Sequence, residues 1–188
     1  MKSSFSIAVW MVLISVILRM IVFLMDWQFT NYEKIYLFGN LFVLMMGVFF
    51  SLRLYKRKVE KTTHFLEDYK AAMRFVGLYA ILMSVFVYIY YSSIDVTYFD
   101  VKLKSQLTLA AEHGMDLDQV KKTGEMILTP FFQSTITLVG FIMLGFIYSA
   151  IIVFTTRKMG AYGERKIQMD TIDTIDTIDK IDKKDKIG

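Results

Sequence analysis

The sequence predicts an all-α polytopic membrane protein whose four transmembrane helices form a bundle. Hydrophobic residues make up 55% of the 188 positions, the mean hydropathy is +0.43, and the charged residues are concentrated between four long apolar stretches. A helix of ~20 mostly apolar residues is long enough to cross ~30 Å of hydrocarbon. The alternation of polar and apolar residues that is typical of membrane β-barrel strands does not occur in the sequence.

The predicted spans cover residues 5–25, 35–54, 73–94 and 131–154. The first is longer than the apolar core of a usual signal peptide, and Asp26 follows it instead of a cleavage site with small residues. We therefore expect an uncleaved membrane anchor. Residues 1–158 form one four-span membrane domain, in which residues 95–130 make an extracytoplasmic loop.

Lysine and arginine are distributed unequally across the predicted bilayer. Sixteen lie at the amino terminus, between spans two and three, or after span four, whereas five lie in the other two loops. Because basic loops remain in the cytoplasm, this positive-inside topology predicts that both termini are cytoplasmic. The net charge of +4 therefore reflects topology, and we expect no nucleic-acid partner.

The connection between spans two and three has the pattern of an amphipathic helix. Thr62 or Thr63 can cap it, and the apolar positions of residues 65–76 recur at helical spacing up to span three. The basic run at residues 56–58 has two interpretations. It is either a topology determinant or a surface that binds anionic lipid.

The sequence of the outer loop, residues 95–130, predicts a pair of short helices. Gly114 is placed to end the first, and Asp116 to cap the second, with Gln119 three residues later. Thr129 and Pro130 have the N-cap and first-turn preferences of a helix start, which is where span four begins. We expect this helical hairpin to lie on the outer membrane surface or against the bundle. It either packs on its own bundle or docks a partner.

The chain after residue 158 is a low-complexity tail. Thr-Ile-Asp recurs at residues 171, 174 and 177 with a period of three. This period builds no single apolar face on a helix or a strand. We therefore expect residues 159–188 to be disordered and cytoplasmic.

Small residues in spans two to four predict close helix packing. They are Gly39, Gly47, Ser51, Gly77, Ser84, Gly140, Gly145 and Ser149.

Polar residues inside the spans are the candidates for a functional site. They are Arg19, Asn40, Tyr88, Gln133 and Thr137. All five are predicted at similar depth, in the outer third of the bilayer. One hypothesis is an outward-facing pocket in which Arg19 binds an anion such as a lipid phosphate. The other is that Arg19 reaches the headgroups or pairs with Asp26 or Asp95, while Asn40 and Gln133 bond between helices.

The sequence offers little for catalysis. It has no Cys and two His, and the predicted topology places His64 and His113 on opposite sides of the membrane. Carboxylates such as Asp95 and Asp100 are expected in solvated loops. The sequence therefore predicts no catalytic residue, no metal and no cofactor, and we expect a protein that is not an enzyme.

The stretch from Thr63 to Asp95, with Phe65 and Tyr69 at the entry to span three and Asp95 at its end, resembles a family. It is similar to an uncharacterised domain-of-unknown-function family of small inner-membrane proteins from Bacteroidota. The resemblance implies the bacterial inner (plasma) membrane and no established activity. We expect an accessory or interaction subunit of a membrane complex. The alternative is a small oligomeric carrier or flippase for a phosphate-bearing lipid. The expected partners are membrane lipids and either another membrane protein or a second copy of the chain.

Overall fold

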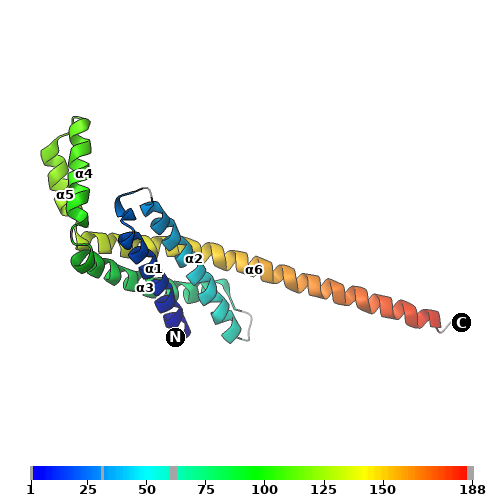
Figure 1. Cartoon of the computed structure of the whole chain (residues 1–188). Helices are drawn as coiled ribbons and strands as arrows, with labels where there is room; N and C mark the ends of the chain where they lie inside the picture. Colours follow the sequence, from blue (N-terminus) through cyan, green and yellow to red (C-terminus); the bar gives the residue numbers. More distant parts are fainter. Residues whose placement is uncertain (1, 31, 60–62, 186–188) are drawn as a thin grey trace.

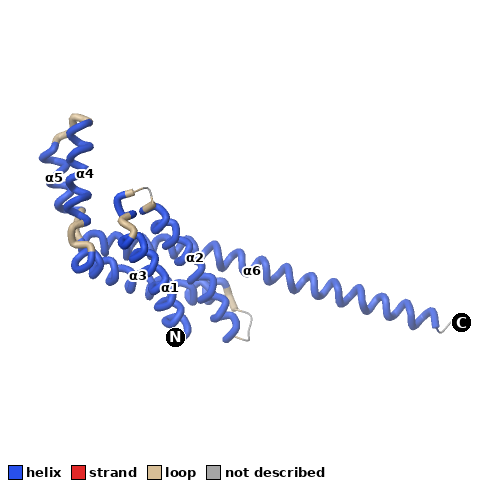
Figure 2. Tube along the Cα trace, in the orientation of Figure 1, coloured by secondary structure: helices blue, strands red, loops and turns tan. Residues whose placement is uncertain are grey.

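The computed structural model describes the backbone of residues 2–30, 32–59 and 63–185, and the side chains of residues 4–30, 32, 34–59 and 63–159. Over the described backbone the chain is helical and forms no strand (Figures 1 and 2). The elements in chain order are α1 (Lys2–Leu24), the 3-10 turn η1 (Trp27–Phe29), α2 (Glu33–Lys58), α3 (Phe65–Ile89), the π-helical turn η2 (Tyr90–Ile94), α4 (Tyr98–Glu112), α5 (Leu117–Ile127) and α6 (Pro130–Asp185).

Four helices in the described part of the chain are long and apolar enough to cross a membrane. They cover Ser4–Leu24, Lys34–Lys58, Phe65–Ile94 and Pro130–Met159. This confirms the predicted fold class and is what a multi-pass membrane protein requires. The third span begins earlier than residue 73, because the amphipathic helix predicted before it is continuous with it.

The start of α3 differs from the prediction in its cap. His64 is the N-cap, and its backbone N–H donates to Glu67 Oε2 at 3.3 Å to complete a capping box. Thr63 instead donates its hydroxyl to Asp68, and Thr62 lies outside the described residues.

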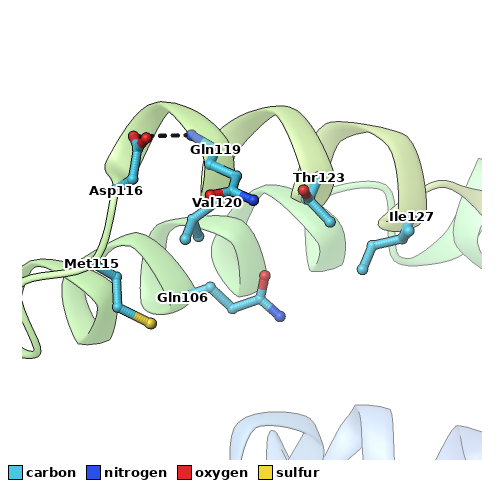
Figure 3. A pocket seen from close by; sticks show the side chains of 8 residues that line it. Gln106, Met115, Asp116, Gln119, Val120, Thr123 and Ile127 are labelled. Carbon is cyan, nitrogen blue, oxygen red and sulfur yellow. Dashed lines mark hydrogen bonds between the residues drawn. The ribbon is translucent and has the colours of Figure 1, made fainter.

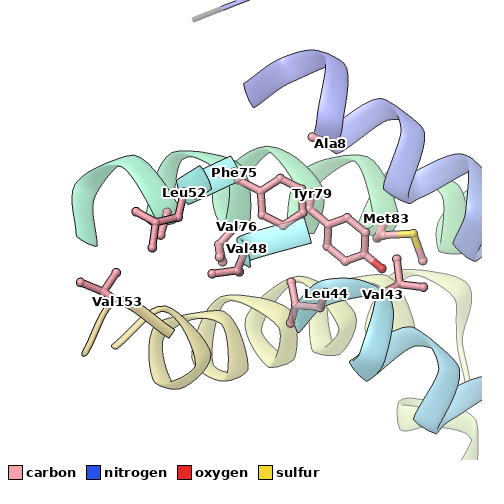
Figure 4. Packing of buried hydrophobic residues seen from close by; sticks show 11 residues of the cluster. Ala8, Val43, Leu44, Val48, Leu52, Phe75, Val76, Tyr79, Met83 and Val153 are labelled. Carbon is pink, nitrogen blue, oxygen red and sulfur yellow. The ribbon is translucent and has the colours of Figure 1, made fainter. Parts of the chain in front are cut away.

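Helix α3 is the centre of the bundle, since it packs against α1, α2 and α6. Its inward stripe follows helical spacing and includes Ala72, Phe75, Tyr79 and Met83, all fully buried. Figure 4 shows Phe75 and Tyr79 lying between side chains of the neighbouring helices. The outward faces of the spans are mostly apolar and exposed, as expected for surfaces that face lipid.

Two glycines are sites of close helix approach. A β-carbon on Gly47 of α2 would overlap the ring of Phe75, and one on Gly145 of α6 would overlap Val76. By contrast, a β-carbon on Gly77 or Gly140 would meet no neighbouring atom within 4 Å. The predicted small-residue packing thus applies to two of these four glycines.

The α4–α5 hairpin has the predicted turn. Gly114 has a φ of 65°, and the N–H groups of Gly114 and Met115 donate back to the carbonyls of Ala111 and Ala110, which is a Schellman motif. Asp116 caps α5 by accepting hydrogen bonds from the N–H groups of residues 118 and 119.

Of the two expected positions of this hairpin, contact with the bundle is found at its base. The hairpin runs crosswise to α3 and α6 and extends away from the bundle (Figures 1 and 2). Among the described side chains, those that join it to the bundle lie at its base and include Tyr98, Phe99 and Leu128. The two helices pack on each other along one face, with Gly124 against Leu103, while Leu109 and Met126 on their other faces are exposed.

The described backbone of α6 continues from span four to Asp185 and extends beyond the bundle (Figure 1). The expected disorder of residues 159–188 stays a prediction. No proline follows Pro130, so no residue in this stretch obliges the helix to end.

Candidate functional site

Arg19 is buried inside the bundle although it carries a charge. It lies on the inward stripe of α1, which Ala8, Ser15 and Val22 share at helical spacing. Its exposed fraction is 2%. The side chain of Arg19 is therefore enclosed by the protein.

Four tyrosines surround the Arg19 guanidinium, and we refer to them as the tyrosine cage. The guanidinium carbon lies 4.7 Å from the ring centroid of Tyr90, and 5.1, 5.4 and 5.5 Å from those of Tyr36, Tyr91 and Tyr98. Its Nη2 also donates a hydrogen bond to Tyr91 Oη at 3.0 Å. Aromatic faces attract cations, and this attraction is stronger where water is excluded. The cage therefore stabilises a charge that hydrocarbon alone would exclude.

Two adjacent tyrosines of the cage stand at the start of the π-helical turn η2. In η2 the Asp95 N–H donates to the Tyr90 carbonyl at 2.9 Å, which adds one residue to the ordinary helical turn. Both Tyr90 and Tyr91 are buried, because they lie three and four residues after Val87 and continue the inward stripe of α3.

Asp95 follows this turn and is buried, with an exposed fraction of 3%. This corrects the expectation of a solvated loop carboxylate. Tyr90 Oη donates to Asp95 Oδ2 at 3.0 Å, so the same ring that faces Arg19 also binds the carboxylate. Tyr90 thus links the two charges.

A cavity of about 220 Å³ adjoins the cage. Four of the five predicted polar residues line it, namely Arg19, Asn40, Gln133 and Thr137, from α1, α2 and α6. Tyr88 does not line it and is 48% exposed. The Thr137 hydroxyl donates to the Gln133 carbonyl at 2.8 Å, so its proton forms a hydrogen bond within α6.

Asn40 also belongs to a hydrogen-bonded chain across three helices. Tyr79 Oη of α3 donates to Asn40 Oδ1 of α2 at 3.3 Å, and Ser15 Oγ of α1 lies 2.8 Å from the same Tyr79 oxygen. Because the tyrosine proton is directed to Asn40, Ser15 is the donor in the second bond. This chain satisfies buried polar groups that would otherwise be costly in a membrane.

A family model described as protein of unknown function, DUF4199, matches residues 6–158. The chain belongs to this family. The resemblance to a domain of unknown function is thereby confirmed. No curated protein and no solved structure matches the chain.

This DUF4199 protein has a second buried polar cluster at the opposite end of its bundle. The fully buried carboxylate of Asp68 accepts hydrogen bonds from Thr63 Oγ1 at 2.6 Å and from Arg157 Nη1 at 2.8 Å. Lys56 Nζ lies 3.3 Å from it. Arg157 Nη1 also donates to the Thr63 carbonyl at 2.7 Å. The cluster joins α2, α3 and α6.

The sequence indicated only part of this cluster. Asp68 follows the start of a predicted helix, where a carboxylate is favoured by the helix dipole alone. Its position three residues before Ala71 and seven before Phe75 places it on the buried stripe of α3. That spacing is the signal that could have identified Asp68 as a buried carboxylate, which requires a cationic side chain as its partner.

Proposed function

We propose that this protein is a non-catalytic accessory subunit of a bacterial inner-membrane complex, and that its α4–α5 hairpin contacts the partner. The observation that supports this is the position of the hairpin, which meets the bundle at its base and extends from it (Figure 1). Its apolar side chains remain uncovered, since Leu109 is 52% and Met126 is 69% exposed. Uncovered apolar surface that does not pack within its own chain is typical of an interaction site.

The hairpin also has a groove of about 510 Å³ between its two helices. Figure 3 shows Met115, Val120 and Ile127 lining this groove together with the polar side chains of Gln106 and Thr123. An apolar groove with polar groups among its lining residues is complementary to an amphipathic helix. The occupant that we propose is therefore an amphipathic helix of another membrane protein.

Co-purification of the full chain from its native membrane in mild detergent, followed by mass spectrometry, tests this function. We expect one membrane protein in stoichiometric amount. The Met115→Asp variant, which places a charge in the groove, should lose it. The Thr108→Asp variant places the same charge on an exposed position of α4 outside the groove, and should retain it. A chain that purifies without a stoichiometric protein partner would overturn the proposal.

A second candidate function is that of a small oligomeric carrier or flippase for a phosphate-bearing lipid. The observation that favours it is the cavity where Arg19 lies beside Asn40 and Gln133, because a guanidinium with neutral donors suits a phosphate group. We rank it second because the guanidinium already donates to Tyr91 and lies among tyrosine rings.

Two substitutions of Arg19 test this second function. A carrier should lose lipid-phosphate binding in Arg19→Leu and retain part of it in Arg19→Lys, since lysine keeps the charge without the planar fork. The measurement is the phosphorylated lipid that copurifies with a homodimer. If Arg19→Leu inserts normally and keeps the bound lipid, the carrier function is rejected.

A further inference from the structure

The end of α2 has a basic cavity that is separate from the tyrosine cage. Phe49, Arg53, Lys56 and Arg57 of α2 and Thr156 of α6 line a space of about 390 Å³. The α2 residues are spaced by four, three and one, so they share one face of the helix. Three cations thus face a single cavity between two spans.

Two of these cations are not neutralised within the described structure. Arg53 and Arg57 are exposed, and no described carboxylate lies within ion-pair distance of either guanidinium. Lys56 differs, because its Nζ lies 3.3 Å from the buried carboxylate of Asp68. The cavity therefore has an excess of positive charge that a ligand could balance.

The order of the residues along α2 resembles the order of groups in a phospholipid. Phe49 lies toward the middle of the span Lys34–Lys58 and is 39% exposed. Arg53 lies one turn later, about 6 Å along the axis, and Arg57 one further turn on. An apolar ring is therefore followed by two guanidinium groups toward the end of the span, as an acyl chain is followed by a phosphate.

We propose that this cavity binds the headgroup phosphate of an anionic phospholipid. Arg53 and Arg57 donate to the phosphate oxygens, and Phe49 contacts the upper part of an acyl chain. Guanidinium groups match the geometry of phosphate through paired N–H donors. Basic pockets between membrane helices are suited to such headgroups. Phe49 favours a lipid over a soluble phosphate, because a soluble ion gains nothing from an aromatic ring at acyl depth.

This proposal differs from a role in topology alone. A topology determinant requires positive charge, which lysine supplies as well as arginine does. A phosphate site also requires the planar fork of the guanidinium, which lysine lacks. Replacement of both arginines by lysine therefore separates the two roles.

The test measures thermal unfolding of the purified full chain in mild detergent, with and without added lipid. We expect phosphatidylglycerol to raise the Tm by about 5 °C at a hundredfold excess over its Kd. Phosphatidylcholine and inorganic phosphate at the same concentration should leave the Tm unchanged. Native mass spectrometry should show retained phosphatidylglycerol on the chain.

The variants decide whether the cavity is the site. Arg53→Gln/Arg57→Gln should weaken phosphatidylglycerol binding about tenfold or more, and Arg53→Lys/Arg57→Lys should also weaken it. Lys121→Gln/Lys122→Gln removes the same charge from exposed positions of α5 and should bind as the wild type does. Equal binding by the wild type and the glutamine variant would overturn the proposal. So would an equal Tm rise with inorganic phosphate or phosphatidylcholine.

Discussion

The carboxylate of Asp68 lies 2.8 Å from Arg157 Nη1, although 89 positions separate these residues in the sequence. The bond joins the first turns of α3 to α6 at the end of the fourth span. Thr63 and Lys56 approach the same carboxylate. A single buried acid thus fixes three helices relative to one another.

Replacement of Asp68 by Asn should destabilise the bundle. Asparagine has nearly the same shape but no charge, so Lys56 and Arg157 would lose the anion that separates them. We expect the free energy of unfolding to fall by about 2–4 kcal/mol, measured by denaturation in mild detergent. The matched control is Asp100→Asn on the exposed face of α4, for which a change within about 0.5 kcal/mol is expected. Equal effects of the two substitutions would contradict the proposed importance of the Asp68 cluster.

Alanine at the bundle glycines should have opposite effects according to position. Gly47→Ala and Gly145→Ala would force a methyl group into Phe75 or Val76, and each should cost about 1–3 kcal/mol. Gly77→Ala and Gly140→Ala meet open space, so the better helix propensity of alanine should leave stability unchanged or raise it by up to about 1 kcal/mol. Unfolding curves of the four variants provide the comparison. A loss of stability at Gly77 as large as that at Gly47 would be inconsistent with the packing described.

Loss of one hydroxyl from the tyrosine cage should be measurable. Tyr91→Phe keeps the ring that faces Arg19 but removes the oxygen that accepts from its Nη2. We expect a decrease of about 1–2 kcal/mol in the free energy of unfolding. Tyr88→Phe, on the exposed side of α3, should change little. The prediction fails if the two variants unfold alike.

The hydrogen-bonded chain from Ser15 through Tyr79 to Asn40 should act as one unit. Tyr79→Phe removes both bonds, and at about 0.6 kcal/mol per bond between membrane helices the expected cost is about 1 kcal/mol. Ser15→Ala should cost about half as much. Combined with Tyr79→Phe it should add almost nothing, because its partner is already gone. A double-mutant cycle measures this coupling, and fully additive effects would exclude it.

Much of the fold could be predicted from local sequence patterns. The four spans follow from apolar runs of sufficient length. The hairpin turn follows from Gly114 and Asp116, because a left-handed residue and a capping carboxylate are decided within a few positions. Four of the five polar residues predicted from the sequence also line one cavity, since residues at equal depth in neighbouring spans lie close together when the spans form a bundle.

The remaining features depend on partners that are far away in the sequence. The partner of Asp68 is Arg157, and no local pattern predicts this pairing. Tyr88 was chosen for its depth in the span, whereas the buried stripe of α3 runs through Met83 and Val87 to Tyr90 and Tyr91 and leaves Tyr88 on the exposed side. The sequence left two positions open for the hairpin, because its amphipathic pattern is the same whether α4 and α5 pack on each other or on the bundle.

The π-helical turn at Tyr90–Ile94 also determines the azimuth of the hairpin around the α3 axis. One residue corresponds to about 100° of rotation in an α-helix. Deletion of Ser92 or Ser93 would allow the turn to close as an ordinary α-turn and would swing Tyr98 away from Arg19. The direction of the whole hairpin, and of the groove in it, thus depends on one added residue. A single-codon deletion in this turn would redirect the proposed partner surface while shortening the third span by one residue at its outer end.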